Sequence, residues 1–257
     1  MVEIMKIVAI IQARMGSTRL PGKVLADITG TPMLKRIIER ISITPFIDQI
    51  VLATTTEEKD NLLEEWIINN FSQVKCFRGD PLDVLDRFYQ CAKLYSADLI
   101  IRVTADDPLK DAAIIRKAIE FFLLSPTLDY CSNTIKPTYP EGLDIEVFKY
   151  SALERAWLES KLLSEREHVT PYIWKNSHLF NIKNFEYTRD LSNWRWTVDK
   201  PIDLIFMNRI YQQFNEDPLV SFENIIKYLD ANPEVSSINN GTIRNEGYLT
   251  SLIGEKL

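Results

Sequence analysis

Short apolar runs rich in β-branched residues alternate with helical patterns along the first part of this chain, and this rhythm limits the fold it can adopt. The apolar runs cover residues 6–12, 49–54, 74–77 and 98–103. Continuous runs of this length are typical of strands buried on both faces. The helical patterns between them cover residues 32–43, 57–70 and 81–96. Strands that alternate with helices imply right-handed crossovers, so the sequence predicts an α/β domain with a mixed, mainly parallel sheet.

The rhythm changes in the second half of the chain. Residues 130–189 hold strand patterns separated by prolines and a glycine, and we interpret them as an inserted arm. A strand pattern at 194–198 then predicts a return to the main sheet, followed by a helix from Pro201. Residues 232–257 are polar and weakly patterned, so we expect a peripheral tail after a single domain formed by residues 1–231. A chain of 257 residues with 46% hydrophobic content is long enough for one such core.

Charge and composition exclude several classes of protein. The chain carries 30 Lys and Arg against 36 Asp and Glu, which argues against general nucleic-acid binding. The cysteines Cys76, Cys91 and Cys131 lack the spacing of a metal site and indicate reduced thiols. Neither a secretory leader nor an apolar run of membrane-spanning length is evident. The sequence therefore predicts a cytoplasmic protein without nucleic-acid or membrane partners.

The segment QARMGSTRLPGK (residues 12–23), which follows the first predicted strand, has the composition of a polyphosphate-binding loop. It combines glycines, which allow tight turns, with hydroxyl and cationic side chains. The cations in and before it are Lys6, Arg14, Arg19 and Lys23. At the carboxyl end of the first strand of an α/β sheet, such a loop lies where ligands bind, and Arg and Lys bind phosphate oxygens. Composition leaves an ordinary solvated basic loop open as the alternative.

Two adjacent carboxylates, Asp106 and Asp107, follow the strand predicted at 98–103, and Pro108 comes directly after them. The burial of the strand does not explain why two carboxylates follow it. A turn stabilised by an Asp side chain would explain it. A magnesium site would also explain it, because Mg²⁺ is bound by one or two carboxylates together with phosphate oxygens and water. We therefore expect one of the two carboxylates to hold a Mg²⁺ ion that bridges phosphate oxygens.

The run IIQARMGSTRLPGKVL (residues 10–25) resembles the signature loop of the CMP-sugar synthetases, and it is most similar to the spore-coat-polysaccharide branch of these cytidylyltransferases. The resemblance implies a single-domain, Rossmann-like (GT-A-like) nucleotidyltransferase fold. It also implies that the loop holds the nucleotide, with Ala13 and Arg14 at the beginning of the nucleotide-binding turn. The implied nucleotide-binding residues are Ala13, Arg14, Ser17, Thr18, Arg19 and Lys23.

A second segment, CFRGDPLDVLDR (residues 76–87), resembles a family stretch that contacts the base. The resemblance puts Arg78 at a base-contacting position and places Asp86 and Arg87 on the family's Asp-Arg pair. The chain departs from the family at residues 83–85, where octulosonate enzymes carry Ser-Gly-Thr. A charge network on one helix face is an alternative explanation for Asp86 and Arg87.

The resemblance also implies where the metal binds. VTADDP (residues 103–108) is similar to the family's VQGDEP segment, which assigns the metal to Asp106. TVDKPIDL (residues 197–204) is similar to the family's IDTPEDL segment, which makes Asp199 the second ligand. Asp203 is better explained as a residue of the first helical turn, where a carboxylate complements the helix dipole.

Two further segments, YPEGLDIEVF and SEREHVTPY, resemble the spore-coat branch and differ from the octulosonate branch. Asp144 and Glu146 have strand spacing, so both point to one face of the sheet. We expect them to bind the hydroxyl groups or an amino group of a sugar. Arg166 and His168 are expected to contact the sugar or to lie in a dimer interface. A purely structural histidine is the alternative for His168.

These features predict transfer of CMP from CTP to a sugar, with release of pyrophosphate, for a surface polysaccharide or glycoconjugate. The predicted catalytic residues are Arg14, Arg19, Lys23 and Asp106, with Asp199 as the other Mg²⁺ ligand. Catalysis of this kind consists mainly of positioning and charge neutralisation. The alternatives are a sugar-1-phosphate pyrophosphorylase that uses another nucleotide and a metal-dependent glycosyltransferase that uses an NDP-sugar. Related synthetases dimerise through an inserted arm, so we predict a homodimer built by residues 130–189, with a lid on a monomer as the alternative.

Overall fold

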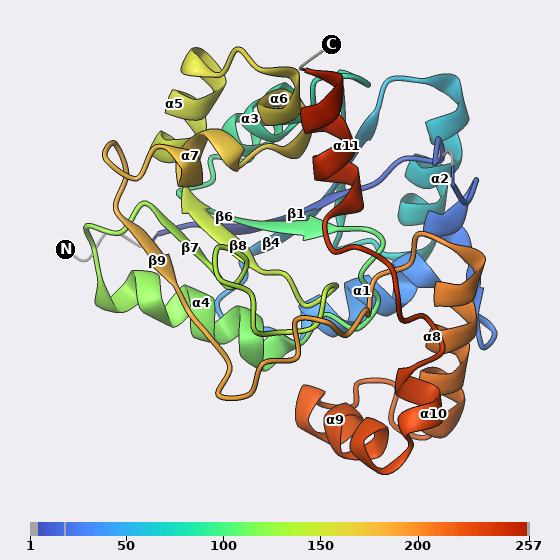
Figure 1. Ribbon diagram of the computed structural model, residues 1–257. Helices are drawn as coiled ribbons and strands as arrows, with labels where there is room; N and C mark the ends of the chain where they lie inside the picture. The colour runs from blue at the N-terminus through green and yellow to red at the C-terminus, as the bar shows by residue number, and fades with distance from the viewer. Residues whose placement is uncertain (1–4, 18, 256–257) are drawn as a thin grey trace.

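One mixed sheet of seven strands runs through the middle of the molecule (Figure 1). The computed structural model describes residues 5–17 and 19–255. Across the sheet the strands follow the order β5-β4-β1-β6-β8-β7-β9. Their bounds are β1 (Ile7–Gln12), β4 (Gln49–Thr55), β5 (Lys75–Gly79), β6 (Leu99–Thr104), β7 (Tyr130–Ser132), β8 (Glu146–Lys149) and β9 (Ile182–Asn184). A separate two-stranded sheet joins β2 (Asp27–Ile28) to β3 (Thr31–Pro32).

The strands β5, β4, β1 and β6 are parallel neighbours, which confirms the predicted α/β domain and its first four strands. Strand β8 runs antiparallel to β6 and β7, and β7 runs parallel to β9. In the register, Ile11 lies between Leu52 on β4 and Val103 on β6. Because the chain order reverses beside β1, a crevice is expected at the carboxyl ends of β1 and β6, where α/β sheets bind ligands.

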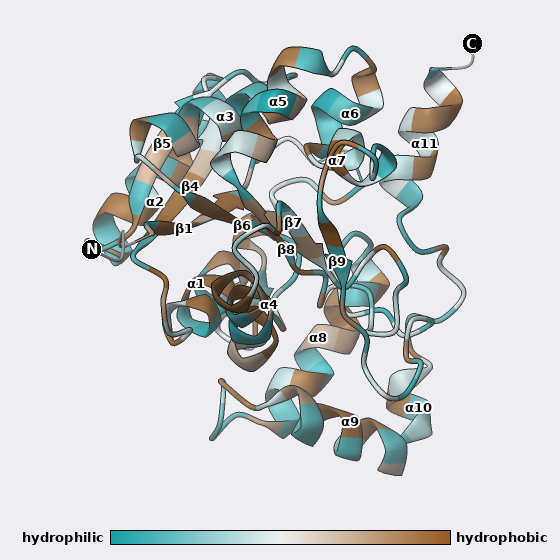
Figure 2. Cartoon of the chain, turned by 90° about the vertical axis from the view of Figure 1, so that its left-hand side faces the viewer, coloured by the Kyte–Doolittle hydropathy of each residue, from teal (hydrophilic) through white to brown (hydrophobic). Residues whose placement is uncertain are grey.

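Helices cover both faces of the sheet, and Figure 2 shows the hydrophobic strands between them. The helices are α1 (Met33–Ser42), α2 (Asn61–Asn70), α3 (Val84–Leu94), α4 (Ala112–Leu124), α5 (Tyr150–Glu159), α6 (Leu163–His168), α7 (Pro171–Lys175), α8 (Pro201–Gln213), α9 (Phe222–Ala231), α10 (Pro233–Ser236) and α11 (Glu246–Gly254). In β1, Ile7, Ala9 and Ile11 belong to the core that contains α1 and α4, whereas Val8 and Ile10 belong to the core that contains α3 and α5. This alternation is the period expected of a strand buried on both faces.

The inserted segment 130–189 widens the sheet and does not project from it as an arm. Its strands β8, β7 and β9 continue the sheet beyond β6. Its helices α5 and α6 pack against α3 on one face of the sheet (Figure 1). The insertion therefore interrupts the alternation of strands and helices while remaining part of the same sheet.

The predicted strand at 194–198 is wrong. Trp196 and Val198 are buried, as the apolar pattern indicated, but the backbone here bonds to loops and not to a strand of the main sheet. The Trp196 amide donates to the Glu141 carbonyl, and the Val198 amide donates to the Asp106 carbonyl. One isolated β-bridge, between Glu141 and Arg195, is found in place of the expected strand pairing. The segment joins loops at the carboxyl end of the sheet to one another.

Residues 232–255, where a peripheral tail was expected, contain two helices and contribute to the wall of a cavity. The segment forms α10 and α11, and Figure 1 shows α11 beside α6, close to the carboxyl end of β1. Glu255 accepts hydrogen bonds from the amide and the hydroxyl of Ser164, which fixes the end of α11 to α6. Within α11, all of whose residues are described, no residue is buried. A helix without buried residues leaves little apolar periodicity in the sequence.

Candidate active site

A cavity of about 980 Å³ opens at the carboxyl ends of β1 and β6. Its walls come from segments far apart in the sequence: the loop after β1, the end of β6, the loop before β8, the α6–α7 region and the start of α11. A volume of this size suits a ligand larger than a simple sugar. The position is the one that the strand order favours for ligand binding.

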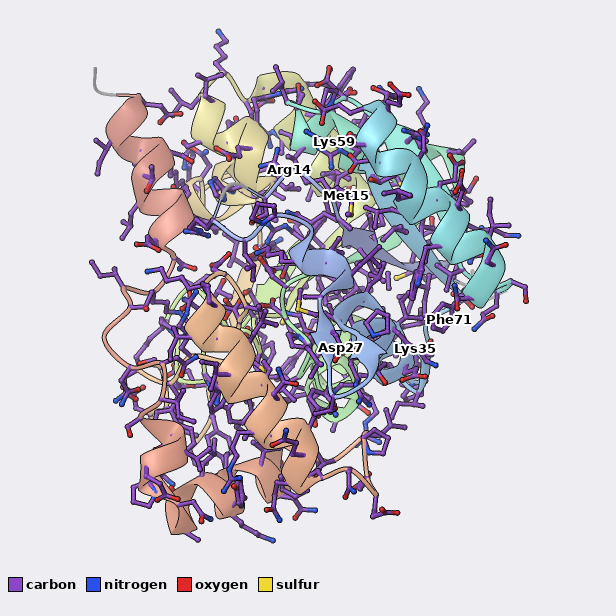
Figure 3. All side chains as sticks on the ribbon, turned by 90° about the vertical axis from the view of Figure 1, so that its right-hand side faces the viewer. Arg14, Met15, Asp27, Lys35, Lys59 and Phe71 are labelled. Atoms are coloured by element: carbon purple, nitrogen blue, oxygen red, sulfur yellow. The ribbon has the colours of Figure 1, made fainter. Side chains whose placement is uncertain are left out.

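The loop after β1 presents its cations to this cavity. Ala13, Arg14, Ser17, Arg19 and Lys23 all line it, whereas Thr18 lies outside the described residues. The loop is closed by a hydrogen bond from the Gly22 amide to the Met15 carbonyl, 3.2 Å long. Gly22 has a φ of +69°, a left-handed conformation that favours glycine. Figure 3 labels Arg14 and Met15 on this loop.

Lys23 lies between the two predicted metal ligands. Its Nζ atom is 2.8 Å from Asp106 Oδ2 and 2.7 Å from Asp199 Oδ1, and it also donates to the Val198 carbonyl at 2.9 Å. Burial alone would lower the pKa of Lys23, but the two carboxylates outweigh burial and raise it. Burial alone would raise the pKa of Asp199, but Lys23 and the neighbouring arginines lower it to about 2. The two carboxylates therefore converge on one positive charge.

Arg195, which the sequence analysis did not single out, fixes the orientation of Asp199. It is buried, and its guanidinium donates to Asp199 Oδ2 at 3.0 Å, to Asp203 Oδ1 at 3.0 Å and to Glu141 Oε2 at 2.7 Å. Asp203 in turn accepts from the amides of Asp199 and Lys200, as expected of a first-turn carboxylate. Arg195 thus fixes the position of Oδ2 of Asp199, and the other oxygen, Oδ1, is left to face the cavity.

Asp106 and Asp107 have different surroundings despite being adjacent. Asp107 is buried and accepts from the Thr104 hydroxyl and, at 2.8 Å, from Lys110 Nζ. Burial raises the pKa of Asp107 to about 6, even though Lys110 opposes this shift. Asp106 faces Lys23, so the arrangement favours Asp106 as the metal-facing carboxylate of the pair.

The donor set at this point fits Mg²⁺. Two carboxylates meet at a position where a cation, the Lys23 ammonium, already lies between them. Within residues 5–17 and 19–255, no group of three His, Cys, Asp or Glu side chains could hold a metal. Two carboxylates are nevertheless enough for Mg²⁺, which commonly completes its coordination with phosphate oxygens and water.

Arg78, which the resemblance assigned to base contact, and the pair Asp86 and Arg87 do not lie together in the structure. Arg87 lines the cavity, and burial followed by the charge of Arg14 lowers its pKa. Arg78 and Asp86 are not among the described residues that line the cavity. Arg78 donates to the carbonyls of residues 55 and 57 and pairs with Glu64, whereas Asp86 accepts from the Trp157 indole at 2.8 Å. The geometry therefore brings Arg87 to the site and leaves Arg78 and Asp86 elsewhere.

The predicted sugar-binding carboxylates both line the cavity, and each is paired with an arginine. Asp144 accepts from Arg244, and Glu146 accepts from Arg102, its neighbour across the β6–β8 ladder. Glu146 also accepts from the Tyr130 hydroxyl at 2.6 Å. Burial alone would raise the pKa of Glu146, but Arg102 and the hydroxyl donors lower it.

Arg166 and His168, which were both expected to contact the sugar or to lie in a dimer interface, have different surroundings in the structure. Arg166 pairs with Asp83 and is not among the described residues of the cavity wall. His168 lines the cavity, and its Nε2 lies 3.0 Å from the Ser251 hydroxyl. Burial, followed by the charge of Arg102, lowers the pKa of His168 to about 4.

The start of α11 completes the cavity wall, a role that the sequence analysis missed. The wall residues from this segment are Asn245, Glu246, Gly247, Tyr248, Thr250 and Ser251. The Asn245 amide donates to Glu141 Oε1 at 2.8 Å, and the Tyr248 ring packs edge-on against His168. The buried Tyr248 hydroxyl has no hydrogen-bond partner within the described part of the chain. A free buried hydroxyl in a cavity wall is available to a ligand.

A mixed, mainly parallel α/β sheet with a cationic loop after its first strand and converging carboxylates beside it has the arrangement expected of a nucleotidyltransferase. The family model named Cytidylyltransferase matches residues 8–234, so the chain belongs to this family and is a cytidylyltransferase-family enzyme. An uncharacterized protein, MJ1063, of Methanocaldococcus jannaschii is 40% identical over 95% of this chain and 98% of its own. The spore coat polysaccharide biosynthesis protein SpsF of Bacillus subtilis is 31% identical over 90% and 97%.

Solved structures show the same architecture. A cytidylyltransferase from Leptospira borgpetersenii superposes with a TM-score of 0.87 at 34% identity, covering 93% of this chain and 99% of that one. A CMP:2-keto-3-deoxy-manno-octonic acid synthetase complexed with CTP superposes with a TM-score of 0.62 at 19% identity, covering 81% and 99%. The second likeness establishes the shared fold. Among the residues described here, no helix is long and apolar enough to cross a membrane.

Proposed function

We propose that this protein transfers CMP from CTP to an oxygen atom of a small sugar acceptor and releases pyrophosphate. The observation that supports this most directly is the convergence of Asp106 and Asp199 on Lys23 at the base of the cationic loop. Membership of the cytidylyltransferase family supports the choice of nucleotide and reaction.

In this proposal the cations of the loop bind the triphosphate. Arg14, Arg19 and Lys23 neutralise the charge that develops on the departing pyrophosphate, and Ser17 adds a hydroxyl donor. The acceptor oxygen bonds to the α-phosphorus as the bond from that phosphorus to the bridging oxygen breaks. A hydroxyl acceptor loses its proton to water. The chain's role is mainly to align these groups and compensate their charge.

Asp106 and Asp199 would hold Mg²⁺ in this proposal. The ion supplies charge compensation at the phosphate oxygens when it is bound. Arg195 keeps Asp199 aimed at the cavity by binding its other oxygen at 3.0 Å. Lys23 must then move from its place between the carboxylates, which brings its ammonium to the phosphates.

The acceptor would occupy the other half of the cavity. Asp144, Glu146 and His168 line this half, and Tyr248 contributes a hydroxyl that has no hydrogen-bond partner among the described residues. Arg102 and Arg244 neutralise the two carboxylates, so these can orient hydroxyl groups without repelling the nucleotide. The likeness to SpsF supports a role in the synthesis of a surface polysaccharide or glycoconjugate.

One observation favours an alternative choice of base. Arg78, which the family resemblance assigned to base contact, is bonded to Glu64 and to backbone carbonyls elsewhere. A sugar-1-phosphate pyrophosphorylase that uses another nucleotide is therefore the second candidate. The two reactions share the phosphate loop and the metal carboxylates and differ in base and acceptor.

A matrix of nucleotides and acceptors tests both candidates. Pyrophosphate release would be measured with CTP, ATP, GTP and UTP, each paired with 3-deoxy-manno-octulosonate, N-acetylneuraminate or a set of sugar 1-phosphates, with Mg²⁺ present. The proposal expects release with CTP and a sugar acceptor. Release restricted to another nucleotide and a sugar 1-phosphate would support the alternative and contradict CMP transfer.

A further inference from the structure

Six charged side chains of alternating sign form a series that begins in the cavity wall and ends at Lys200, which is not among the described residues of that wall. In order they are Asp106, Lys23, Asp199, Arg19, Glu246 and Lys200. The successive N–O distances are 2.8, 2.7, 2.7, 3.1 and 3.2 Å. The first four side chains belong to the proposed metal and phosphate site. Glu246 and Lys200 have no role in the function proposed above.

Glu246 lies between two cations at the outer end of this series. Arg19 binds Asp199 through Nη2 at 2.7 Å and Glu246 through Nη1 at 3.1 Å. Lys200 Nζ lies 3.4 and 3.2 Å from the two oxygens of the same carboxylate. A carboxylate held in this way by Arg and Lys occupies a position that also suits phosphate oxygens, since both anions take the same charge-assisted hydrogen bonds.

We propose that Arg19 and Lys200 form the subsite for the pyrophosphate end of the nucleotide and that Glu246 occupies this subsite in the free protein. The inference rests on the proposed nucleotidyl transfer. A triphosphate offers more negative charge and more oxygen atoms than one carboxylate, so it displaces Glu246 from both cations. Glu246 returns to Arg19 and Lys200 as pyrophosphate departs, and it thereby favours product release.

The solvent exposure of these side chains allows the exchange. The side chains of Arg19, Glu246 and Lys200 are 39%, 38% and 35% exposed, whereas Lys23 and Asp199 are each 14% exposed. An ion pair exposed to this degree changes an equilibrium only about two- to five-fold. Glu246 is therefore the carboxylate of the series that a phosphate replaces most easily.

The displacement does not require α11 to leave the protein. Arg244, just before the helix, is bound to Asp144, and Glu255 at its end is bound to Ser164. Glu246 is the first residue of α11 and lies between these two anchors. Movement of its side chain, or of the first turn, is enough to free Arg19 and Lys200.

Calorimetry with magnesium pyrophosphate and magnesium CTP tests the proposal without knowledge of the acceptor. Glu246→Gln removes the competing charge and should bind both ligands about three- to ten-fold more tightly than the wild type. Lys200→Met should bind them about three- to ten-fold more weakly. Glu234→Gln changes an exposed carboxylate of α10 that is not among the described residues of the cavity wall, and its affinity should stay within about two-fold of the wild type. Thermal unfolding would confirm that each variant is folded.

Two outcomes are distinguishable. If the wild type binds magnesium pyrophosphate and Glu246→Gln binds it no more tightly, Glu246 is not a competitor and the inference is overturned. If the wild type binds neither magnesium pyrophosphate nor any magnesium nucleotide, the proposed nucleotidyl transfer itself fails, and the inference fails with it.

Discussion

Asp106 and Asp199 are the residues on which the proposed chemistry depends most. Both carboxylates contact Lys23, and the pKa of Asp199 is lowered to about 2, so Asp199 carries its negative charge at neutral pH. We predict that Asp106→Asn and Asp199→Asn each lower the turnover number by about 100-fold or more, because charge compensation at the α-phosphate is lost. Pyrophosphate release with Mg²⁺ measures the effect. Asp217→Asn, which changes an exposed carboxylate, is the control. Activity close to wild type in either site variant would remove that residue from the mechanism.

His168 is kept neutral by its surroundings. Burial and then the charge of Arg102 lower its pKa to about 4, whereas a histidine in an unfolded chain titrates near pH 6.5. As the pH falls through this window, the unfolded state binds a proton that the folded state does not bind. Folding stability is therefore lost between about pH 6.5 and pH 4, and below pH 4 the loss is complete.

This linkage predicts a pH-dependent difference between variants. Between pH 7 and pH 5, the free energy of unfolding of the wild type should fall about 1–2 kcal/mol further than that of His168→Gln. Urea denaturation at the two pH values measures the difference. His178→Gln, which changes an exposed histidine, should follow the wild type. An equal fall in the wild type and in His168→Gln would contradict the low pKa.

At the scale of elements, Gly142 fixes the contact between two loops of the site. Its φ is +103°, and a Cβ atom there would lie 2.5 Å from the backbone carbonyl of Trp196. Gly142→Ala should therefore lower the free energy of unfolding by about 2–5 kcal/mol, through backbone strain and overpacking together. Gly241→Ala is a matched control, because Gly241 has a φ of +89° but open space around it. Equal losses in the two variants, measured by urea denaturation, would show that strain alone acts at Gly142.

Whether a helix or strand can be predicted from the sequence depends on how many of its residues are buried. Strands β1 and β6 are buried on both faces, and the sequence predicted them correctly. Helix α3 was predicted from residue 81 but begins at Val84, because the Asp83 side chain caps it by accepting from the amide of Asp86. Helix α11 has no buried residue among residues 246–254, so its pattern was too weak to predict. The pattern of apolar residues indicates which positions are buried, but it does not indicate which residues form hydrogen bonds with one another.

At the scale of the molecule, the site combines residues that local motifs identify with residues that only the fold brings in. Arg14, Lys23 and Asp106 lie in short motifs whose composition indicates phosphate or metal binding. Arg195 and Glu246 carry no such local signal. Glu246 meets Arg19 across 227 positions of the chain, and Arg195 meets Glu141 across 54. Contacts of this range depend on tertiary packing, so a single sequence does not predict them.

The surface of the inserted segment bears on assembly. Two large aromatic residues of this segment have partners within the chain: Trp157 stacks on Tyr89, and Trp174 packs against Tyr248. A different group of apolar residues in the segment is exposed. Leu158, Leu162 and Leu163 lie close together in sequence at the junction of α5 and α6. The expectation of a dimer therefore now depends on these leucines.

We predict that the protein is a homodimer in solution and that the leucines at the α5–α6 junction lie in its interface. Leu158, Leu162 and Leu163 are 68%, 46% and 76% exposed, and apolar side chains grouped on a surface mark interaction sites. Light scattering at micromolar concentration should give about twice the chain mass of 29.8 kDa. The double variant Leu158→Glu/Leu163→Glu should give the mass of one chain, because two charges buried in an interface would oppose association. Leu62→Glu, at a leucine of α2 that is 55% exposed, should leave the dimer intact. A wild-type mass near 29.8 kDa would rule out the dimer and leave the segment as a wall of a monomeric site.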